Sequence, residues 1–223
     1  MVFARHSGGD ASGKISALLV PAGTPGVTVG PRDEKMGQHG AWTADVGFSD
    51  VEVPAGALIG TPGEGYVTAM RCLAHGRLHI AALCVGLAQR ALDETIGYAL
   101  ERRQGGHPIA EYQLIQGLIA DSQTDVLAGR GLVQSAAADF DSGADRRLGP
   151  SCAKYFCSEM VCRVTDRAVQ VHGGAGYMRG VPVERFYRDA RLFRIYEGTS
   201  QIQQLVIAKQ ALLAHTSRGA GGR

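Results

Sequence analysis

Short apolar segments separated by glycine and proline fill the first 60 residues, a pattern that predicts β-strands joined by turns. Paired breakers such as Gly8-Gly9 and Pro25-Gly26 bound these segments. The predicted strands are Val2 to Ala4, Ile15 to Val20, Val27 to Val29 and Ala44 to Val53. We therefore expect residues 1–60 to form part of an antiparallel β-domain.

From about Glu64 the apolar spacing becomes helical, because Ile80, Leu83, Leu87 and Ala91 follow one another at steps of 3, 4 and 4. Glycine and proline stop signals divide the remainder into four amphipathic helices, with a short turn before the last. The predicted helices run from about Gly65 to Arg103, from about Ile115 to Asp141-Ser142-Gly143, from Pro150-Ser151 to Gly173 and from about Thr199 to Leu213, with the turn around Pro182 to Arg191. Residues 61–223 are thus predicted to form an antiparallel four-helix bundle. The fold class is α+β: a partial antiparallel β-domain followed by this bundle.

The charge balance and the length of the apolar runs exclude several classes of function. The chain has 23 Lys and Arg against 21 Asp and Glu, whereas an electrostatic nucleic-acid binder needs a basic stripe. Its longest apolar run, Ile80 to Ala88, has nine residues, and a membrane span needs about 20. Residues 1–6 carry no secretory signal or transit peptide, and five cysteines suit a reducing compartment. We expect a cytoplasmic protein, or one of the mitochondrial matrix if the source is eukaryotic.

Two spacings of cysteine and histidine resemble those of metal sites, but both favour a structural role for these residues. Cys152, Cys157 and Cys162 recur every five residues. On a helix this spacing rotates each side chain by about 140° from the one before, so the three sulfur atoms cannot converge on one metal ion. His75 and His79 stand four residues apart without a third ligand in a matching motif. We predict no metal site.

The segment around Glu197 carries the clearest candidate chemistry. Glu197 stands between the apolar pair Ile195-Tyr196 and Gly198, and Thr199 or Ser200 is placed to cap the helix that follows. Desolvation beside apolar neighbours makes a carboxylate more basic, which suits a general base. A surface glutamate in a loop fits the local pattern equally well.

Gly173-Gly174-Ala175-Gly176 resembles a dinucleotide-binding loop only at first sight. The preceding residues are helical, and Arg179 stands where the third glycine of that fingerprint belongs. The Rossmann interpretation therefore fails. A glycine-rich helix exit remains, which serves either as a stop signal or for close approach of a ligand.

Taken together, the motifs resemble those of the acyl-CoA dehydrogenase family from residue 1 to about Leu213. Each motif is weak alone, but their order along the chain is highly specific. They are Glu34-Lys35-Met36-Gly37, the segment from Val46 to Pro54, Gly63-Glu64-Gly65-Tyr66, Gly76-Arg77, Tyr98 to Gln104, Gln113, Gln170 to Tyr177, Arg188-Asp189 and Ile195 to Gln203.

The resemblance implies an FAD enzyme that oxidises an acyl-CoA thioester to the trans-2-enoyl-CoA. Glu197 matches the base that removes the α proton, and Gly198 matches a backbone position that contacts substrate. Arg77 matches an arginine lining the CoA channel, and a structural ion pair is an equal alternative for it. The positions that match FAD contacts are Arg102, Gln104, Gln113, Gln170, Val171, His172, Gly173, Gly174, Thr199, Ser200 and Gln201. Of these, Arg102 and residues 170–174 usually reach into the neighbouring subunit's site.

The resemblance also implies partners and a longer parent protein. An electron-transfer flavoprotein is the expected electron acceptor, and the chain is expected to form homodimers or homotetramers. The family's N-terminal helical domain and the first half of its β-domain have no counterpart here, so we expect the chain to begin inside that β-domain. Gly105 replaces a usual aromatic residue, and Ala74 replaces a frequent polar or acidic one. The alternatives are a non-catalytic partner subunit or inactive remnant, and an acyl-CoA oxidase.

Overall fold

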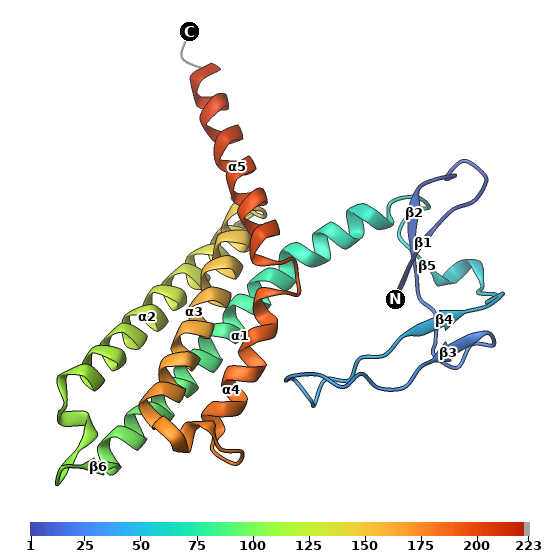
Figure 1. The fold of residues 1–223 in the computed structure, drawn as a ribbon. Helices are drawn as coiled ribbons and strands as arrows, with labels where there is room; N and C mark the ends of the chain where they lie inside the picture. The colour runs from blue at the N-terminus through green and yellow to red at the C-terminus, as the bar shows by residue number, and fades with distance from the viewer. Residues whose placement is uncertain (221–223) are drawn as a thin grey trace. The chain divides into compact units, whose positions relative to one another are not determined.

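The chain forms two compact units, which we describe separately. The structure is a computed structural model that describes the backbone of residues 1–220 and the side chains of residues 1–216 (Figure 1). The first unit comprises residues 1–35 and 39–73, and the second comprises residues 36–38 and 74–223. The boundary between the two units therefore falls within the first long helix. It lies later in the chain than the change of sequence pattern near residue 60, where we predicted the boundary.

Antiparallel strand pairs build the first unit, as the alternating pattern predicts. Strand β1 (Val2–Arg5) pairs with β2 (Ile15–Leu18), and β2 pairs with the two-residue strand β5 (Leu58–Ile59). A separate pair joins β3 (Val27–Val29) to β4 (Val46–Phe48). The fourth predicted strand is shorter than expected because the backbone turns at Asp50, where φ is +47°. Strand β5 escaped prediction because two residues are too few to show alternation.

Five α-helices lie in the described residues, and the second unit is built from them except for residues 65–73, which belong to the first unit. They are α1 (Gly65–Glu101), α2 (Gln113–Ser142), α3 (Leu148–His172), α4 (Pro182–Ala190) and α5 (Ser200–Ala220). Short 3-10 helices, η3 (Gly173–Tyr177) and η4 (Arg191–Arg194), flank α4. A hairpin of β6 (Arg103–Gln104) and β7 (His107–Pro108) joins α1 to α2. Through these short connections α1, α2 and α3 run alternately in opposite directions, and α4 and α5 both run opposite to α3 (Figure 1).

The core of the second unit draws on α1, α2, α3, α4 and η4. Its fully buried members include Leu92, Val126, Met160, Val183 and Phe193. Helices α2 and α3 approach closely at Gly129, where an added Cβ would lie 2.9 Å from the methyl carbon of Met160. The final helix α5 packs against α3 and then extends beyond the ends of α2 and α3 (Figure 1).

Helix α4 corrects the prediction of a short turn around Pro182 to Arg191. Pro182 occupies the first turn of the helix, where it costs no hydrogen bond. Val183, Phe186 and Ala190 then place an apolar stripe on the core at helical spacing, and Glu184 pairs with Arg188 at 2.8 Å. The segment escaped prediction because charged residues separate these three positions. The last helix also runs past the predicted end at Leu213, to Ala220.

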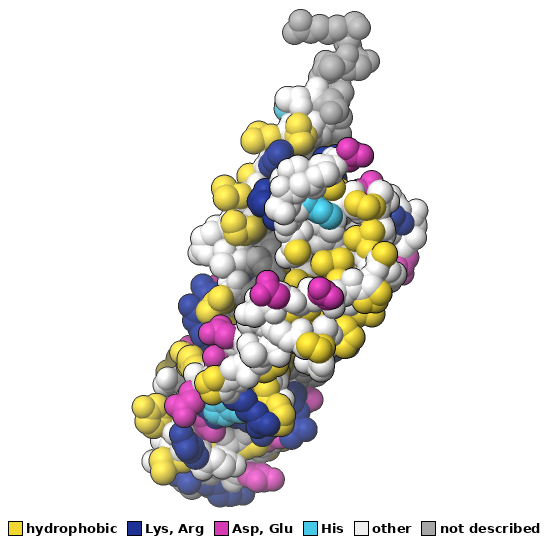
Figure 2. Space-filling view, turned by 90° about the vertical axis from the view of Figure 1, so that its right-hand side faces the viewer, with side chains coloured by type: hydrophobic (Ala, Val, Ile, Leu, Met, Phe, Trp, Pro, Cys, Tyr) yellow, Lys and Arg dark blue, Asp and Glu magenta, His cyan; other side chains and the backbone are white. Residues whose placement is uncertain are grey.

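Charges of both signs are intermixed on the face that Figure 2 shows, and no single basic patch dominates it. This distribution agrees with the net charge of +2. Among the described residues, no helix combines the length and apolarity that a membrane crossing requires.

Candidate active site

Glu197 lies at the apex of a tight left-handed turn between η4 and α5. Its φ is +56°, and that of Gly198 is +85°. A glutamate rarely adopts this backbone region, and such strain persists only where the surroundings impose it. The prediction of a carboxylate on a tight turn therefore agrees with the local backbone. The surface alternative does not, because Glu197 is half-buried and its Oε2 atom is buried.

Two buried side chains hold the carbonyl groups of this turn. The Nε2 atom of Gln203 donates to the Glu197 carbonyl at 3.0 Å and to the Gly198 carbonyl at 3.2 Å. The ammonium of Lys154, in α3, donates to the Gly198 carbonyl at 2.7 Å. A Cβ at position 198 would lie 2.6 Å from Gln203 Nε2. Glycine is therefore required there both by the backbone angle and by the space.

A carboxylate of α3 ties down both flanks of the turn. One oxygen of Glu159 accepts from Arg194 Nε at 2.8 Å and from the Ser200 hydroxyl at 2.6 Å. The Thr199 hydroxyl accepts from the Ile202 amide at 3.3 Å. Of the two predicted caps, Thr199 therefore caps α5, while Ser200 contacts Glu159.

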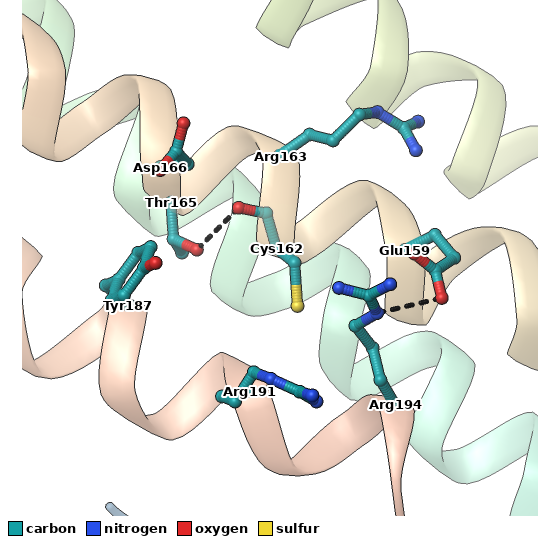
Figure 3. A pocket seen from close by; sticks show the side chains of 8 residues that line it. All are labelled: Glu159, Cys162, Arg163, Thr165, Asp166, Tyr187, Arg191 and Arg194. Carbon is teal, nitrogen blue, oxygen red and sulfur yellow. Dashed lines mark hydrogen bonds and ion pairs between the residues drawn. The ribbon is translucent and has the colours of Figure 1, made fainter. Parts of the chain in front are cut away.

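The contact between Glu159 and Arg194 lies at the edge of a cavity of about 290 Å³ (Figure 3). The cavity lies between α3 and the α4–η4 segment, and its lining residues are Glu159, Cys162, Arg163, Thr165, Asp166, Tyr187, Arg191 and Arg194. None of the predicted site residues lines it.

The Glu197 carboxylate projects onto α1 at a glycine. A Cβ at Gly76 would lie 2.7 Å from Glu197 Oε2, so the missing side chain is what makes room for the carboxylate. The next residue, Arg77, donates from Nη1 to the Ser151 hydroxyl at 3.2 Å. Burial lowers the pKa of Arg77, and the nearby Glu197 partly offsets that effect. No ion pair of Arg77 is found among the described residues.

Polar atoms without partners gather at this turn. Among the described residues, three buried side-chain atoms lack a hydrogen bond: Arg77 Nε, Glu197 Oε2 and Gln203 Oε1. Buried polar atoms are almost always satisfied in folded proteins, so a cluster of exceptions points to a functional site. A carboxylate oxygen that is desolvated and unpaired is available to accept a proton from a ligand.

Tyr196 and Ile195 flank the carboxylate differently. Tyr196 packs beside Phe193, with 5.8 Å between ring centroids, and burial raises its pKa to about 12. Its hydroxyl therefore stays neutral near Glu197. Ile195 is half-exposed, so only one of the two predicted apolar neighbours packs inward.

Six of the predicted FAD contacts line a second cavity, of about 550 Å³, where α1 and α3 end. These six are Arg102, Gln104, Val171, His172, Gly173 and Gly174. Five further residues complete the lining: Tyr98, Ile109, Tyr112, Ile115 and Ala175. Cavities of this size suit organic ligands.

This second cavity combines a free cation, open backbone and aromatic rings. The guanidinium of Arg102 has no hydrogen-bond or ion-pair partner among the described residues. Added Cβ atoms at Gly173 and Gly174 would meet no atom within 4 Å. Tyr98 stacks on His172 at 4.2 Å, and His172 Nδ1 contacts the Ala168 carbonyl at 2.8 Å. These features fit a phosphate-bearing ligand with a flat ring system, such as FAD.

Gly105 has a local reason for replacing an aromatic residue. It and Gly106 form the turn between β6 and β7, with φ of +60° and +89°, and such tight hairpin turns favour glycine. Tyr112 contributes an aromatic ring nearby, and its hydroxyl donates to the Gln104 carbonyl at 2.7 Å.

The structure divides the predicted cofactor residues into three groups, of which the six that line the second cavity are the largest. Thr199, Ser200 and Gln201 lie beside Glu197, whereas Gln113 and Gln170 are exposed and line neither cavity. Along α3, Lys154 contacts the turn and His172 lines the second cavity; they are 18 residues apart (172 − 154), or about 27 Å. One chain thus carries two separate clusters.

Sequence reasoning missed Lys154, Gln203, Tyr98 and Tyr112. A signal existed for Lys154, because it falls on the buried stripe of α3 with Cys157 and Val161. The rings of His75 and His79 lie against each other at an angle of 51°, with 4.4 Å between their centroids. The described residues hold no group of three or more side chains suited to a metal ion.

Comparison with known proteins identifies the family. The profile of the acyl-CoA dehydrogenase C-terminal domain matches residues 63–212. The chain is 46% identical over 203 residues to the probable acyl-CoA dehydrogenase YngJ of Bacillus subtilis, covering 91% of this chain and 53% of that protein. It is 42% identical over 212 residues to the caffeyl-CoA reductase-Etf complex subunit CarC of Acetobacterium woodii, covering 95% and 56%.

A solved structure shows the same likeness. The acyl-CoA dehydrogenase of Bacillus anthracis, complexed with FAD, superposes with a TM-score of 0.91 at 30% identity. The match covers 98% of this chain and 40% of the Bacillus anthracis chain. The fold and the profile define a chain of the acyl-CoA dehydrogenase C-terminal type. This chain belongs to the acyl-CoA dehydrogenase family. It spans about half the length of the curated relatives it matches.

Proposed function

We propose that this chain carries the catalytic base of an FAD-dependent acyl-CoA dehydrogenase. The observation that carries the proposal is the buried Oε2 atom of Glu197, which has no hydrogen-bond donor among the described residues. Thioester α protons are very weakly acidic, so a base that removes them must be desolvated and held in place. The burial of Glu197 Oε2 supports the first condition, and the buried anchors Lys154 and Gln203 support the second.

In the proposed reaction Glu197 accepts the α proton of an acyl-CoA thioester. The electron pair of that C–H bond forms the Cα–Cβ double bond as the β hydrogen leaves with its own pair. FAD, when bound, supplies the acceptor for that hydride. The backbone at Gly198 contacts the substrate, and Arg77 lines the channel for its CoA portion. The enolate-like charge that develops must also be stabilised.

The second cavity is proposed to hold part of FAD. Arg102 would pair with the pyrophosphate, and the open backbone at Gly173 and Gly174 would allow its close approach. The distance of this cavity from Glu197 along α3 supports the expectation that it serves the cofactor of a neighbouring subunit. Thr199, Ser200 and Gln201 would contact the cofactor next to Glu197, and Gln113 and Gln170 are proposed as peripheral contacts.

The proposal includes partners and a location. Acyl-CoA is the substrate, and an electron-transfer flavoprotein is the electron acceptor. The name of the CarC relative supports association with such a flavoprotein, because it places that protein in a complex with Etf. A homo-oligomer follows from the shared cofactor site, and the cytoplasm is the proposed compartment.

Anaerobic titration of the purified protein with FAD and then with acyl-CoA tests the proposal. A yellow protein whose flavin absorbance is bleached by acyl-CoA would support it. A colourless protein that still assembles into oligomers would favour a non-catalytic partner subunit instead. Rapid oxygen consumption when air is admitted to the bleached protein would favour an acyl-CoA oxidase.

A further inference from the structure

Lys154 is the buried lysine among the four of this chain. Its side chain has no solvent-accessible surface, because it stands in the middle of the core-facing stripe of α3, among apolar residues. Removing an ammonium from water is costly unless the interior compensates for it. Its position therefore calls for a reason beyond filling space.

The surroundings of the ammonium identify what it serves. Its one hydrogen bond among the described residues is donated to the Gly198 carbonyl at 2.7 Å, directly after Glu197. The charged and titratable groups that act on it are Cys84 and Arg77 from α1, Glu159 from its own helix, and Glu197 from the turn. Burial lowers the pKa of Lys154, and both carboxylates oppose that effect.

Satisfying the Gly198 carbonyl does not by itself require Lys154. Gln203 Nε2 already donates to that oxygen at 3.2 Å and also to the Glu197 carbonyl. Gln203 lies in α5, only a few residues beyond the turn, so it can move together with the turn. Lys154 instead connects the apex of the turn to α3, which is fixed in the core.

We propose that Lys154 is a positioning residue: through the Gly198 carbonyl it fixes the left-handed Glu197–Gly198 turn on α3, so that the Glu197 carboxylate stays against Gly76 and faces the substrate α carbon. The inference rests on the proposed function and assigns a residue that the family resemblance did not supply. Without Lys154 the turn would keep its local hydrogen bonds and the contacts of its flanks with Glu159. Its apex would lose its bond to α3, and the base would be misaligned.

The test isolates proton abstraction from the oxidation that follows. The probe is 3,3-dimethylbutanoyl-CoA, which has α hydrogens and no hydrogen on its β carbon, so it cannot be dehydrogenated. In D₂O, transfer of the α proton to Glu197 and its return as a deuteron labels the α carbon, which NMR or mass spectrometry detects. The assay uses the FAD-loaded protein with Lys154→Met and, as a matched control, Lys209→Met, which replaces an exposed lysine of α5.

We expect Lys154→Met to slow α-carbon exchange by about 100-fold, the effect of a displacement on the order of 1 Å. The FAD content, the acyl-CoA dissociation constant and the melting temperature should stay close to wild type, because a methionine fills the same space without a buried charge. Amide exchange across residues 199–203 should become faster. Lys209→Met should match wild type in every measurement.

Three outcomes separate the inference from the proposed function. Wild-type exchange in Lys154→Met overturns the inference alone, provided that Glu197→Gln abolishes exchange. Absence of exchange in the wild-type protein defeats the proposed function itself. If Lys154→Met melts well below wild type, it and Lys154→Leu, which likewise carries no donor, are measured at a temperature where both are folded, and undiminished exchange there also overturns the inference.

Discussion

The two clusters of predicted site residues are built in opposite ways. At the Glu197 turn the backbone is strained, the anchors Lys154 and Gln203 are buried, and three polar atoms lack partners. At the cavity where α1 and α3 end, the backbone at Gly174 is open, and Arg102 is exposed and unpaired among the described residues. The Glu197 turn holds a single side chain in a fixed place, whereas the cavity exposes a cation and open backbone that a ligand can contact.

This difference matches what each cluster is proposed to do. Proton abstraction depends on the position of one oxygen to within about 1 Å, so its support must be rigid and desolvated. Binding a large charged cofactor depends on the sum of many contacts and tolerates small shifts in each one. Substitutions at the turn should therefore change rate, whereas substitutions at the cavity should change affinity.

The largest effect is expected for Glu197→Gln. Glutamine has nearly the same shape but cannot accept the α proton, so we expect flavin bleaching by acyl-CoA to fall by about 10²- to 10⁴-fold, the usual contribution of a general base. FAD content should not change. Stopped-flow absorbance of the loaded protein measures the rate, with Glu52→Gln, at an exposed glutamate, as the control. Bleaching at the wild-type rate would remove Glu197 from the role of base.

Gly76→Ala tests the same turn from the side of α1. The new Cβ would lie 2.7 Å from Glu197 Oε2 and 3.1 Å from its carboxyl carbon, so the carboxylate must move. We expect the bleaching rate to fall by about 10- to 100-fold. Stability should hardly fall, because alanine is favoured over glycine within a helix by about 1 kcal/mol.

Gly86→Ala is the matched control for that substitution. It lies in the same helix, and an added Cβ there meets no atom within 4 Å. We expect a slightly higher melting temperature and an unchanged bleaching rate. Equal rates for the two alanine variants would show that the space beside Gly76 is not what positions the carboxylate.

The sequence revealed where helix α1 lies but not which of its faces is buried. Helix α1 was predicted from its apolar spacing, yet its core contacts come largely from small residues such as Ala81, Cys84 and Ala88, while Leu83 is half-exposed. Periodicity found the helix because any amphipathic face gives the same period. It did not find the buried face, because close packing favoured small side chains over large ones.

Site residues were predictable where the signal is local. Gly198 and the helix start at Thr199 mark the turn, and Gly173-Gly174 marks a glycine-rich helix exit. Arg102 and the other residues predicted at the second cavity were named from the family resemblance. The supports of the turn come from distant parts of the chain: Lys154 lies 44 residues before Gly198, and Gly76 lies in another helix. The stripe of α3 marks Lys154 as buried, but no local pattern reports what its ammonium contacts, which is why its role was missed.

At the cavity, Arg102→Ala should lower affinity without lowering the maximal rate. It removes the cation proposed to face the pyrophosphate, and a charged hydrogen bond contributes about 1.5–3 kcal/mol. We expect the FAD dissociation constant to rise by about 10- to 100-fold, measured by fluorescence titration, and the bleaching rate at saturating FAD to stay at wild type.

Arg103→Ala is the control for that measurement. Its guanidinium already donates to the Gly106 carbonyl at 3.1 Å, and it does not line the cavity. Its FAD affinity should stay within about twofold of wild type, a difference of less than about 0.5 kcal/mol. A loss of affinity equal to that of Arg102→Ala would mean that general positive charge, and not this cavity, attracts FAD.

The smallest effect is expected for Tyr112→Phe, which leaves the aromatic lining in place and removes one hydroxyl. That hydroxyl donates to the Gln104 carbonyl at 2.7 Å and braces the β6–β7 hairpin beside Arg102. Because the residue is partly exposed, water can replace the bond. We expect the binding free energy of FAD to weaken by about 0.5–1 kcal/mol, which is a two- to fivefold lower affinity. Tyr177→Phe, at a largely exposed tyrosine that lines neither cavity, should have no effect. A change in bleaching rate at saturating FAD would contradict the division of rate and affinity between the two clusters.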